Sequence, residues 1–241
     1  MHFTVLVIGD DFESQLEPFW ELDLPKETIK DDYRAEFHSD VVKEILEEDF
    51  IKYKQELKRD WVDKVVPLED DYNTLDEYAL IQHGYYFDEK TNSYGYYLNP
   101  NSRWDWFTVG GRWTGYFKLK EGRTGDIGQP GTGNNKPIEG YVDIVRKGDI
   151  DFEGMTKDSI ETAKRSWEEA KSEKDKAMKN FSYGIEENDT EETYIKRMSN
   201  FKPNSILYNG EWIEDMLDRE FKELIERIPN NTILTIVDCH I

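Results

Sequence analysis

The sequence predicts an α+β fold, in which two or three amphipathic helices cover a mostly antiparallel or mixed β-sheet. Strand-like apolar segments lie near both ends of the sequence, and segments with a helical hydrophobic period flank its centre. The two kinds of segment do not alternate regularly, as they do in doubly wound parallel sheets. At roughly 100–200 residues per domain, the 241 residues are expected to form a single α+β domain over residues 1–241.

The expected strands include both terminal segments. Residues 3–8 form a short apolar run bounded by Gly9, which is typical of a buried strand. Residues 232–238 form a second such run, and pairing the two would close one sheet. The other expected strands, in order, are residues 85–88, 94–98, 113–120 and 140–146, with a hairpin turn over 89–93 and a long Gly-rich loop over 121–137.

Four segments show helical signals. Apolar residues recur at three- and four-residue steps over residues 39–65 and 211–227, which predicts amphipathic helices. A third helix is expected over residues 157–180, where the stripe is narrower, and the acidic segment 157–200 could project into solvent. A fourth, short helix over 75–82 follows Thr74 and Glu77, which have the spacing of a capping box.

The charge of the chain is unevenly distributed. The 31 basic and 52 acidic residues give a net charge of −21. Residues 1–81 hold 23 acidic and 9 basic residues, and residues 149–241 hold 22 and 13. Residues 82–148 hold 7 acidic and 9 basic residues, which gives a net charge of +2. Because DNA and RNA are bound by basic faces, direct nucleic-acid binding is not expected.

Aromatic residues gather in the slightly basic centre. Twelve of the 33 aromatic residues lie within residues 85–117. They could form the core of a β-sheet, a stacking surface for a base, sugar or peptide, or both, because core aromatics often line pockets.

Several features indicate a cytoplasmic protein. Cys239 is the single cysteine, so no disulfide within the chain is expected. The first residues lack the basic segment and cleavage site of a signal peptide. No run approaches the 18 apolar residues of a membrane span, so we expect no membrane association.

The densest cluster of candidate site residues is Trp104-Asp-Trp-Phe-Thr-Val-Gly-Gly-Arg-Trp113. Gly110 and Gly111 permit positive φ or close approach of another backbone, and Arg112 could bind carboxylate or phosphate. The indoles of the segment could hold a ring or stack on the arginine; the candidate residues are Trp104, Asp105, Trp106, Gly110, Gly111, Arg112 and Trp113. The alternative is a tight turn in which Asp105 pairs with Arg112 and the tryptophans fill the core.

The segment Asp238-Cys-His240 is a second candidate. In a strand, Asp238 and His240 would share one face and Cys239 would point away. The pair could serve as a general base or as part of a metal site, and His240 could join Arg112 if the last strand lies beside the central segment. The alternative is a fraying segment with a buried cysteine.

Two further patterns have weaker functional signals. The alternating carboxylates Asp149, Asp151 and Glu153 could hold a divalent metal, but such clusters arise readily among 52 acidic residues, so no metal site and no cofactor are assigned. The glycines of residues 122–133 could cradle a phosphate, but they lack the ending of a nucleotide-binding loop. His2, His38 and His83 show no ligand spacing and are expected to be structural or exposed.

Several islands of the sequence resemble an uncharacterised family of bacteriophage and prophage proteins. The resemblance covers the opening strand, Trp104-Asp-Trp106, the Gly-Gly-Arg-Trp113 step, residues 149–155 and the ending Val237-Asp-Cys-His-Ile241; residues near 210–212 depart from it. It implies a viral origin and the cytoplasm of a host cell, and it assigns no catalytic role.

Two functional hypotheses follow. The first is an accessory protein that binds and modulates or inhibits a host defence or nucleic-acid-handling protein with a basic surface; its partner-binding residues would be Glu44, Glu47, Glu48 and Asp49. The second is a nucleotide-like small-molecule site, enzymatic or sequestering, at the tryptophan and Gly-Gly-Arg-Trp segment with Asp238 and His240.

Overall fold

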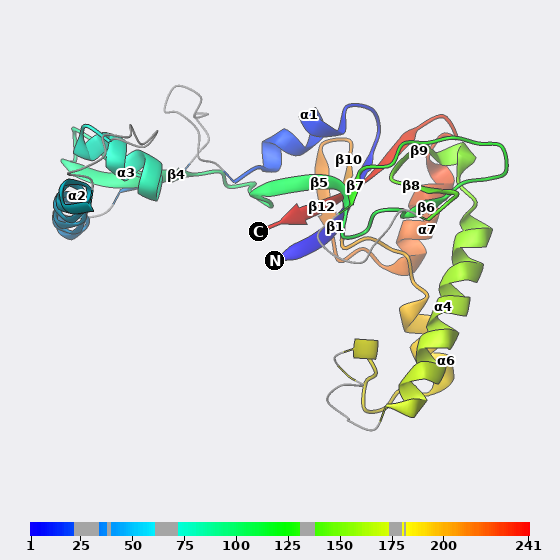
Figure 1. Ribbon diagram of the computed structural model, residues 1–241. Helices are drawn as coiled ribbons and strands as arrows, with labels where there is room; N and C mark the ends of the chain where they lie inside the picture. The colour runs from blue at the N-terminus through cyan, green and yellow to red at the C-terminus, as the bar shows by residue number, and fades with distance from the viewer. Residues whose placement is uncertain (22–33, 38–39, 61–71, 131–137, 174–179, 181) are drawn as a thin grey trace. The chain divides into compact units, whose positions relative to one another are not determined.

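The computed structural model describes residues 1–21, 34–37, 40–60, 72–130, 138–173, 180 and 182–241. The chain divides into two compact units, one of Met1–Glu17 with Trp104–Ile241 and one of Pro18–Arg103 (Figure 1). Each unit has its own sheet and its own helices. The sequence predicts a single domain over residues 1–241. Whether the two units form one domain depends on how they are joined, so this stays a prediction.

The larger unit is built on a mixed sheet. Its strand order is β11-β10-β1-β12-β5-β7, and β9 also pairs with β12. The bounds are β1 (His2–Ile8), β5 (Trp106–Gly111), β7 (Gln129–Pro130), β9 (Ile144–Arg146), β10 (Ser205–Tyr208), β11 (Glu211–Glu214) and β12 (Ile233–His240). β1 is parallel to β10 and antiparallel to β12, and β12 is antiparallel to β5. The α+β prediction and the pairing of the two terminal strands are confirmed.

The main core lies on one face of this sheet. Helix α7 (Asp218–Arg227) and the start of α4 (Phe152–Ser172) cover this face. The buried cluster consists largely of Leu6, Ile8, Ile206, Leu234 and Ile236 from the strands with Phe221, Leu224, Ile225 and Met155 from the helices. Side chains alternate along a strand, so the intervening residues face the other side. There, Phe12 of α1 (Phe12–Leu16) packs on Phe107 of β5, with ring centroids 6.2 Å apart.

Helix α4 extends beyond the sheet, and α6 (Glu191–Met198) lies beside it (Figure 1). Trp167 of α4 packs on Tyr194 of α6 with ring centroids 5.2 Å apart. Helix α4 begins five residues before the sequence predicts, because the Asp151 carboxylate accepts a hydrogen bond from the Gly154 amide and caps the first turn.

The smaller unit packs two helices on a three-stranded sheet of order β2-β4-β3. Its elements are β2 (Arg34–Phe37), α2 (Asp40–Asp60), α3 (Leu75–His83), β3 (Tyr86–Asp88) and β4 (Ser93–Leu98). Leu46, Ala79 and Tyr94 form its buried centre. The predicted hairpin between β3 and β4 and the capping box of Thr74 and Glu77 are confirmed.

Residues 211–214 are the clearest correction. The helix expected over residues 211–227 begins only at Asp218, and Glu211–Glu214 is instead a strand paired with β10. Asn209 and Gly210 connect the strands with φ values of 54° and 77°. Two successive positive φ values are those of a type I′ turn, which favours Asn-Gly and closes a two-residue hairpin.

The segment expected as a strand over residues 113–120 is also largely irregular. The short strand β6 covers only Phe117–Lys118 and pairs with β8 (Tyr141–Val142). The main strand of this region is β5, which precedes it. Parts of three other predictions, namely residues 39 and 61–65, residues 131–137 and residues 174–179, lie outside the described residues.

Candidate functional site

The Gly110-Gly111 step brings two carboxylates against the end of β5. Both glycines have positive φ, 75° and 54°. A Cβ on Gly110 would lie 2.4 Å from Asp143 Oδ2, and one on Gly111 would lie 2.4 Å from the Asp238 Cβ. No side chain fits at either position, so glycine is required for two reasons, conformation and close approach. The approaching groups are side chains and not another backbone.

The first of these carboxylates, Asp143, is fully buried and organises the turn after β5. It accepts hydrogen bonds from the amides of Gly115 at 2.6 Å and Gly128 at 2.9 Å, and from the Thr114 hydroxyl at 3.0 Å. These bonds replace the strand pairing that the sequence predicts for residues 113–116. Gly128 of the Gly-rich segment thus donates to the protein's own carboxylate.

The second carboxylate belongs to a polar row at the end of the sheet. Register places His2 opposite His240 and His240 opposite Trp106, so the three side chains share one face. The Trp106 indole stacks on His240 with centroids 5.3 Å apart and planes 13° apart. The His2 ring meets both edge-on, at 5.1 Å from Trp106 and 5.0 Å from His240. The row lies beyond the part of the face that α7 covers.

Each histidine has its own carboxylate. His2 Nδ1 lies 2.8 Å from Asp238 Oδ1, and the backbone amide of Arg112 donates to Asp238 Oδ2 at 2.9 Å. His240 Nδ1 lies 3.0 Å from both oxygens of Asp105. A carboxylate on Nδ1 fixes the ring orientation and leaves Nε2 to meet a ligand or proton.

The electrostatics of the two carboxylates follow from their surroundings. Partial burial acts to raise the pKa of Asp105, but the hydrogen bonds from His240 and from the Trp106 amide hold this pKa below its usual value. The side chain of Asp105 is 42% exposed, whereas that of Asp238 is 3% exposed. The Asp238 carboxylate is thus enclosed by its two donors.

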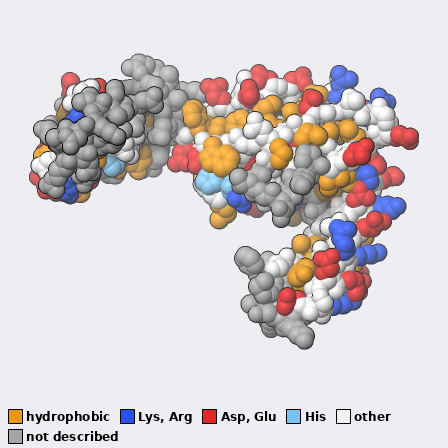
Figure 2. Space-filling model, viewed as in Figure 1, with side chains coloured by type: hydrophobic (Ala, Val, Ile, Leu, Met, Phe, Trp, Pro, Cys, Tyr) orange, Lys and Arg blue, Asp and Glu red, His pale blue; other side chains and the backbone are white. Residues whose placement is uncertain are grey.

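A pocket opens beside this row. It has a volume of about 200 Å³ and is lined by His2, Trp106, Thr108, Gly111, Arg112, Gln129, Pro130 and Asp238. Figure 2 shows histidine surface next to hydrophobic side chains at the ends of β1 and β12. The lining combines an indole, a guanidinium and a histidine bonded to a buried carboxylate. Such a site can stack a ring, pair with an anion and move a proton.

The structure brings together part of the residues that the sequence singles out. Trp106, Gly111, Arg112 and Asp238 line the pocket, and Asp105 and His240 adjoin it. By contrast, Trp104 is buried on the other face of the sheet. Its ring centroid lies 5.0 Å from that of Phe107, and its Nε1 donates to the Leu16 carbonyl.

Two further candidates, Gly110 and Trp113, have structural roles. Gly110 adjoins Asp143, and the Trp113 amide donates to the Gly110 carbonyl at 2.9 Å and closes the turn. Cys239 is buried opposite the pocket, and this burial raises the pKa of its thiol, which disfavours the nucleophilic thiolate. The alternation of Asp238, Cys239 and His240 along the strand is the one that the sequence indicates.

His2 is a pocket residue that no sequence motif indicates. It was expected to be structural or exposed, yet its ring contacts Asp238, Trp106 and His240. A signal was present, because an antiparallel pairing of the two terminal strands places residue 2 opposite residue 240. His2 also continues the face of Thr4, Leu6 and Ile8 on alternate positions.

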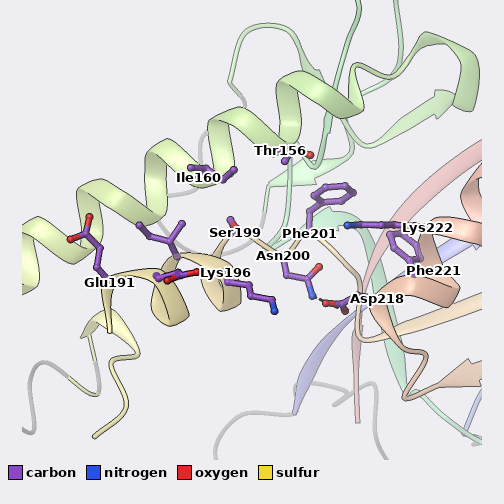
Figure 3. Close-up of a pocket in the computed structure, with 12 residues that line it drawn as sticks. Thr156, Ile160, Glu191, Lys196, Ser199, Asn200, Phe201, Asp218, Phe221 and Lys222 are labelled. Carbon is purple, nitrogen blue, oxygen red and sulfur yellow. Dashed lines mark hydrogen bonds between the residues drawn. The ribbon is translucent and has the colours of Figure 1, made fainter. Parts of the chain in front are cut away.

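A larger cavity lies elsewhere in the same unit, between α4, α6 and α7 (Figure 3). Its volume is about 710 Å³, and its walls include Ile160, Ile195, Phe201 and Phe221. The Asn200 amide and the Asp218 carboxylate at its rim bond to each other at 2.9 Å. The described residues that line it include no histidine, cysteine, arginine or tryptophan. The larger cavity thus offers lysines, carboxylates and phenylalanines, whereas the smaller pocket combines an indole, a guanidinium and an imidazole.

The acidic residues proposed for partner binding lie on α2. Glu44, Glu47 and Glu48 are exposed, while Leu46 between them is 2% exposed and packs into the core of the smaller unit. Asp49 is half-buried, and its carboxylate lies 3.3 Å from Lys52 Nζ. Three of the four carboxylates thus point to solvent.

Asp149 and Asp151, the alternating carboxylates, have separate structural partners. Asp149 pairs with Arg123 at 3.4 Å, and Asp151 caps α4. Among the described residues, no three His, Cys, Asp or Glu side chains are grouped to hold a metal ion. Within the same residues, no helix has the length and hydropathy needed to cross a bilayer.

Comparisons of this sequence and structure with protein-family models, with curated proteins and with solved structures find no significant match.

Proposed function

We propose that this protein binds a small anionic molecule with an aromatic ring, of the nucleotide class, at the pocket of His2, Trp106, Arg112 and Asp238. The observation that carries this proposal is the position of Trp106. Its side chain is 45% exposed, and its indole is held parallel to the imidazole of His240. An indole fixed in this way offers a preformed surface on which a base can stack.

The charge around the pocket supports an anionic ligand. Arg112 is the one lysine or arginine among the described lining residues, and it lies in the segment of net charge +2. Asp238 and Asp105, the two nearby carboxylates, would repel an anion. Each adjoins a histidine, and a protonated histidine offsets this repulsion. A guanidinium binds phosphate through two parallel hydrogen bonds.

The volume indicates how such a ligand would sit. About 200 Å³ is below the roughly 300–1,000 Å³ of pockets that enclose a drug-sized molecule. The pocket therefore suits a phosphate and part of a sugar, with the base on Trp106 at the rim.

The test is binding of adenosine and AMP, with GMP, CMP and UMP, by calorimetry and thermal shift. We expect AMP to bind and adenosine to bind more weakly, because adenosine lacks the phosphate. Arg112→Ala should weaken AMP binding at least tenfold. Arg123→Ala is the matched control, because Arg123 pairs at the surface with Asp149 and lies outside the pocket lining. Absence of binding by all four nucleotides would show that the proposal is wrong.

A second candidate function is binding of a host protein through α2. Glu44, Glu47 and Glu48 present their carboxylates to solvent around a buried Leu46, and the resemblance to phage proteins suggests a partner in the host cytoplasm. A basic partner surface would be attracted to these charges, most strongly at low salt.

Two variants separate the candidates. Replacing Glu44, Glu47 and Glu48 together by lysine should abolish capture of a basic host protein and leave nucleotide binding unchanged. Arg112→Ala should do the opposite. If charge reversal leaves capture unchanged, the second candidate is excluded.

A further inference from the structure

We infer that the pocket also hydrolyses a phosphodiester bond of a single nucleotide, with His2 as general base and His240 as general acid. This inference rests on the proposed function, because the substrate must first bind at Trp106 and Arg112. Its basis is the presence of two histidines on one face, each held by a separate aspartate.

His2 has the geometry of a base. Asp238 Oδ1 lies 2.8 Å from its Nδ1, so the carboxylate favours the tautomer with the proton on Nδ1 and the lone pair on Nε2. Asp238 is itself fixed by the Arg112 amide. Within the described part of the chain, Nε2 of His2 makes no hydrogen bond, and the ring lines the pocket beside Arg112. A water in the pocket could therefore give its proton to this atom.

His240 has the geometry of an acid. Its Nδ1 lies 3.0 Å from both oxygens of the Asp105 carboxylate, which orients the ring. Its Nε2 lies 3.2 Å from the amine of Met1. In the acid role His240 carries a proton on Nε2, and the leaving oxygen of the substrate takes the place of the amine. The two rings contact each other edge-to-face, with centroids 5.0 Å apart, so we place the phosphate over both rings, within reach of each Nε2 atom.

The reaction then balances with water alone. Nε2 of His2 takes a proton from water as the water oxygen bonds to phosphorus. The bond from phosphorus to the ribose oxygen breaks, and His240 donates its proton to that oxygen. One water is consumed, a monoester is formed, and the two histidines return to their starting states by proton exchange with solvent. Arg112 stabilises the charge on the non-bridging oxygens.

Charge selects the class of phosphodiester. The protein carries a net charge of −21, and Arg112 is the one permanent cation among the described lining residues, so a polyphosphate or a long nucleic acid is repelled. A phosphodiester within one nucleotide carries a single negative charge. The substrate class that fits is a cyclic nucleoside monophosphate, with either a 2′,3′ or a 3′,5′ ring.

The experiment uses the 241-residue protein without added residues at either end, because Met1 and His240 are neighbours. Hydrolysis of 2′,3′-cyclic AMP and 3′,5′-cyclic AMP is followed by chromatography from pH 5 to pH 9. We expect turnover of one of them, with a bell-shaped dependence of kcat/KM on pH. His2→Gln and His240→Gln should each lower kcat by about 10²–10⁴-fold.

Each variant should also remove one limb of the dependence of kcat/KM on pH. Loss of a purely structural residue does not have this effect. His83→Gln is the control, because His83 is an exposed histidine of the smaller unit. If a histidine variant does not fold by circular dichroism, the wild-type profile decides: two limbs support the inference, and a flat profile from pH 5 to pH 8 overturns it.

The two proposals fail separately. Wild-type protein that binds AMP but hydrolyses neither cyclic nucleotide overturns this inference and leaves the proposed binding function standing. Protein that binds no nucleotide overturns both. A wild-type rate in His2→Gln would also overturn the assignment of the base.

Discussion

The α-carbon of Gly111 lies directly against the side chain of Asp238, so closely that a Cβ there would come within 2.4 Å of the Asp238 Cβ. This contact joins the turn after β5 to β12 and sets the position of the Arg112 amide, which donates to the same carboxylate. Packing of a glycine thus fixes the candidate base, since Asp238 in turn holds His2.

Gly111→Ala should destabilise the protein and weaken ligand binding. Its φ of 54° costs an L-residue about 1 kcal/mol, and displacement of Asp238 adds about 1–3 kcal/mol. Gly122→Ala is the control, because φ there is 72° but nothing lies within 4 Å of the new Cβ. Chemical denaturation should show a loss for Gly111→Ala that exceeds the control by at least about 1 kcal/mol. Equal losses would contradict the contact.

Asp143→Asn should be strongly destabilising. The buried carboxylate accepts bonds from Thr114, Gly115 and Gly128, and an amide group can accept on one side only. Leaving buried N–H groups unpaired costs about 1–3 kcal/mol each. The change in the free energy of unfolding, measured in urea, should be at least about 2 kcal/mol. Asp126→Asn, at an exposed aspartate, should change it by less than about 0.5 kcal/mol.

Asp158 should make stability depend on pH in the acid range. Hydrogen bonds from Lys118 and Tyr141, each at 2.5 Å, lower the pKa of Asp158. Ionised Asp158 therefore stabilises the fold above the pKa of an unfolded aspartate, about 3.9, and this contribution is lost as pH falls through the lowered pKa.

The measurement compares the Tm of wild type and Asp158→Asn from pH 7 downward. The variant should be less stable than wild type at pH 7, by no more than about 1 kcal/mol, because the pair is partly exposed. This difference in stability should become smaller below about pH 4. Glu139→Gln removes a charge from an exposed residue and should show no such narrowing. A gap that stays constant with pH would exclude this role for Asp158.

Asp151 should act as a helix cap. Its carboxylate accepts a bond from the Gly154 amide at 2.9 Å at the start of α4. Asp151→Ala should lower the free energy of unfolding by about 1 kcal/mol, and Asp151→Ser should restore most of it because serine caps equally well. If serine behaves like alanine, the carboxylate has another role at this position.

Local signals predicted much of the fold. Strands β1 and β12 were indicated by apolar runs, and α3 by the Thr74–Glu77 capping box. The error at residues 211–214 shows one signal overriding another. The hydrophobic period of α7 extends the predicted helix back to residue 211, directly after Asn209-Gly210, although that pair is a strong hairpin signal in its own right.

The site was predictable only in part, because its contacts depend on sheet register. Asp238 and His240 were recognised by their spacing, and Arg112 by its flanking glycines and tryptophan. Which carboxylate meets which histidine follows from the pairing of β1, β12 and β5, which no local pattern specifies. Likewise, the irregular backbone after β5 is imposed by Asp143, 28 residues from Gly115 along the chain.

The central position of β12 has a consequence for folding. It pairs on one side with β1, residues 2–8, and on the other with β5, yet it follows every other strand of the sheet in sequence. The contacts between β1 and β12 span most of the chain, and such non-local pairings slow folding because loop-closure entropy is lost before they form. Until β12 is in place, β1 and β5 each expose an unpaired edge, which favours aggregation. Refolding should therefore be slow and should depend on protein concentration, and deletion of residues 233–240 should leave a chain that associates.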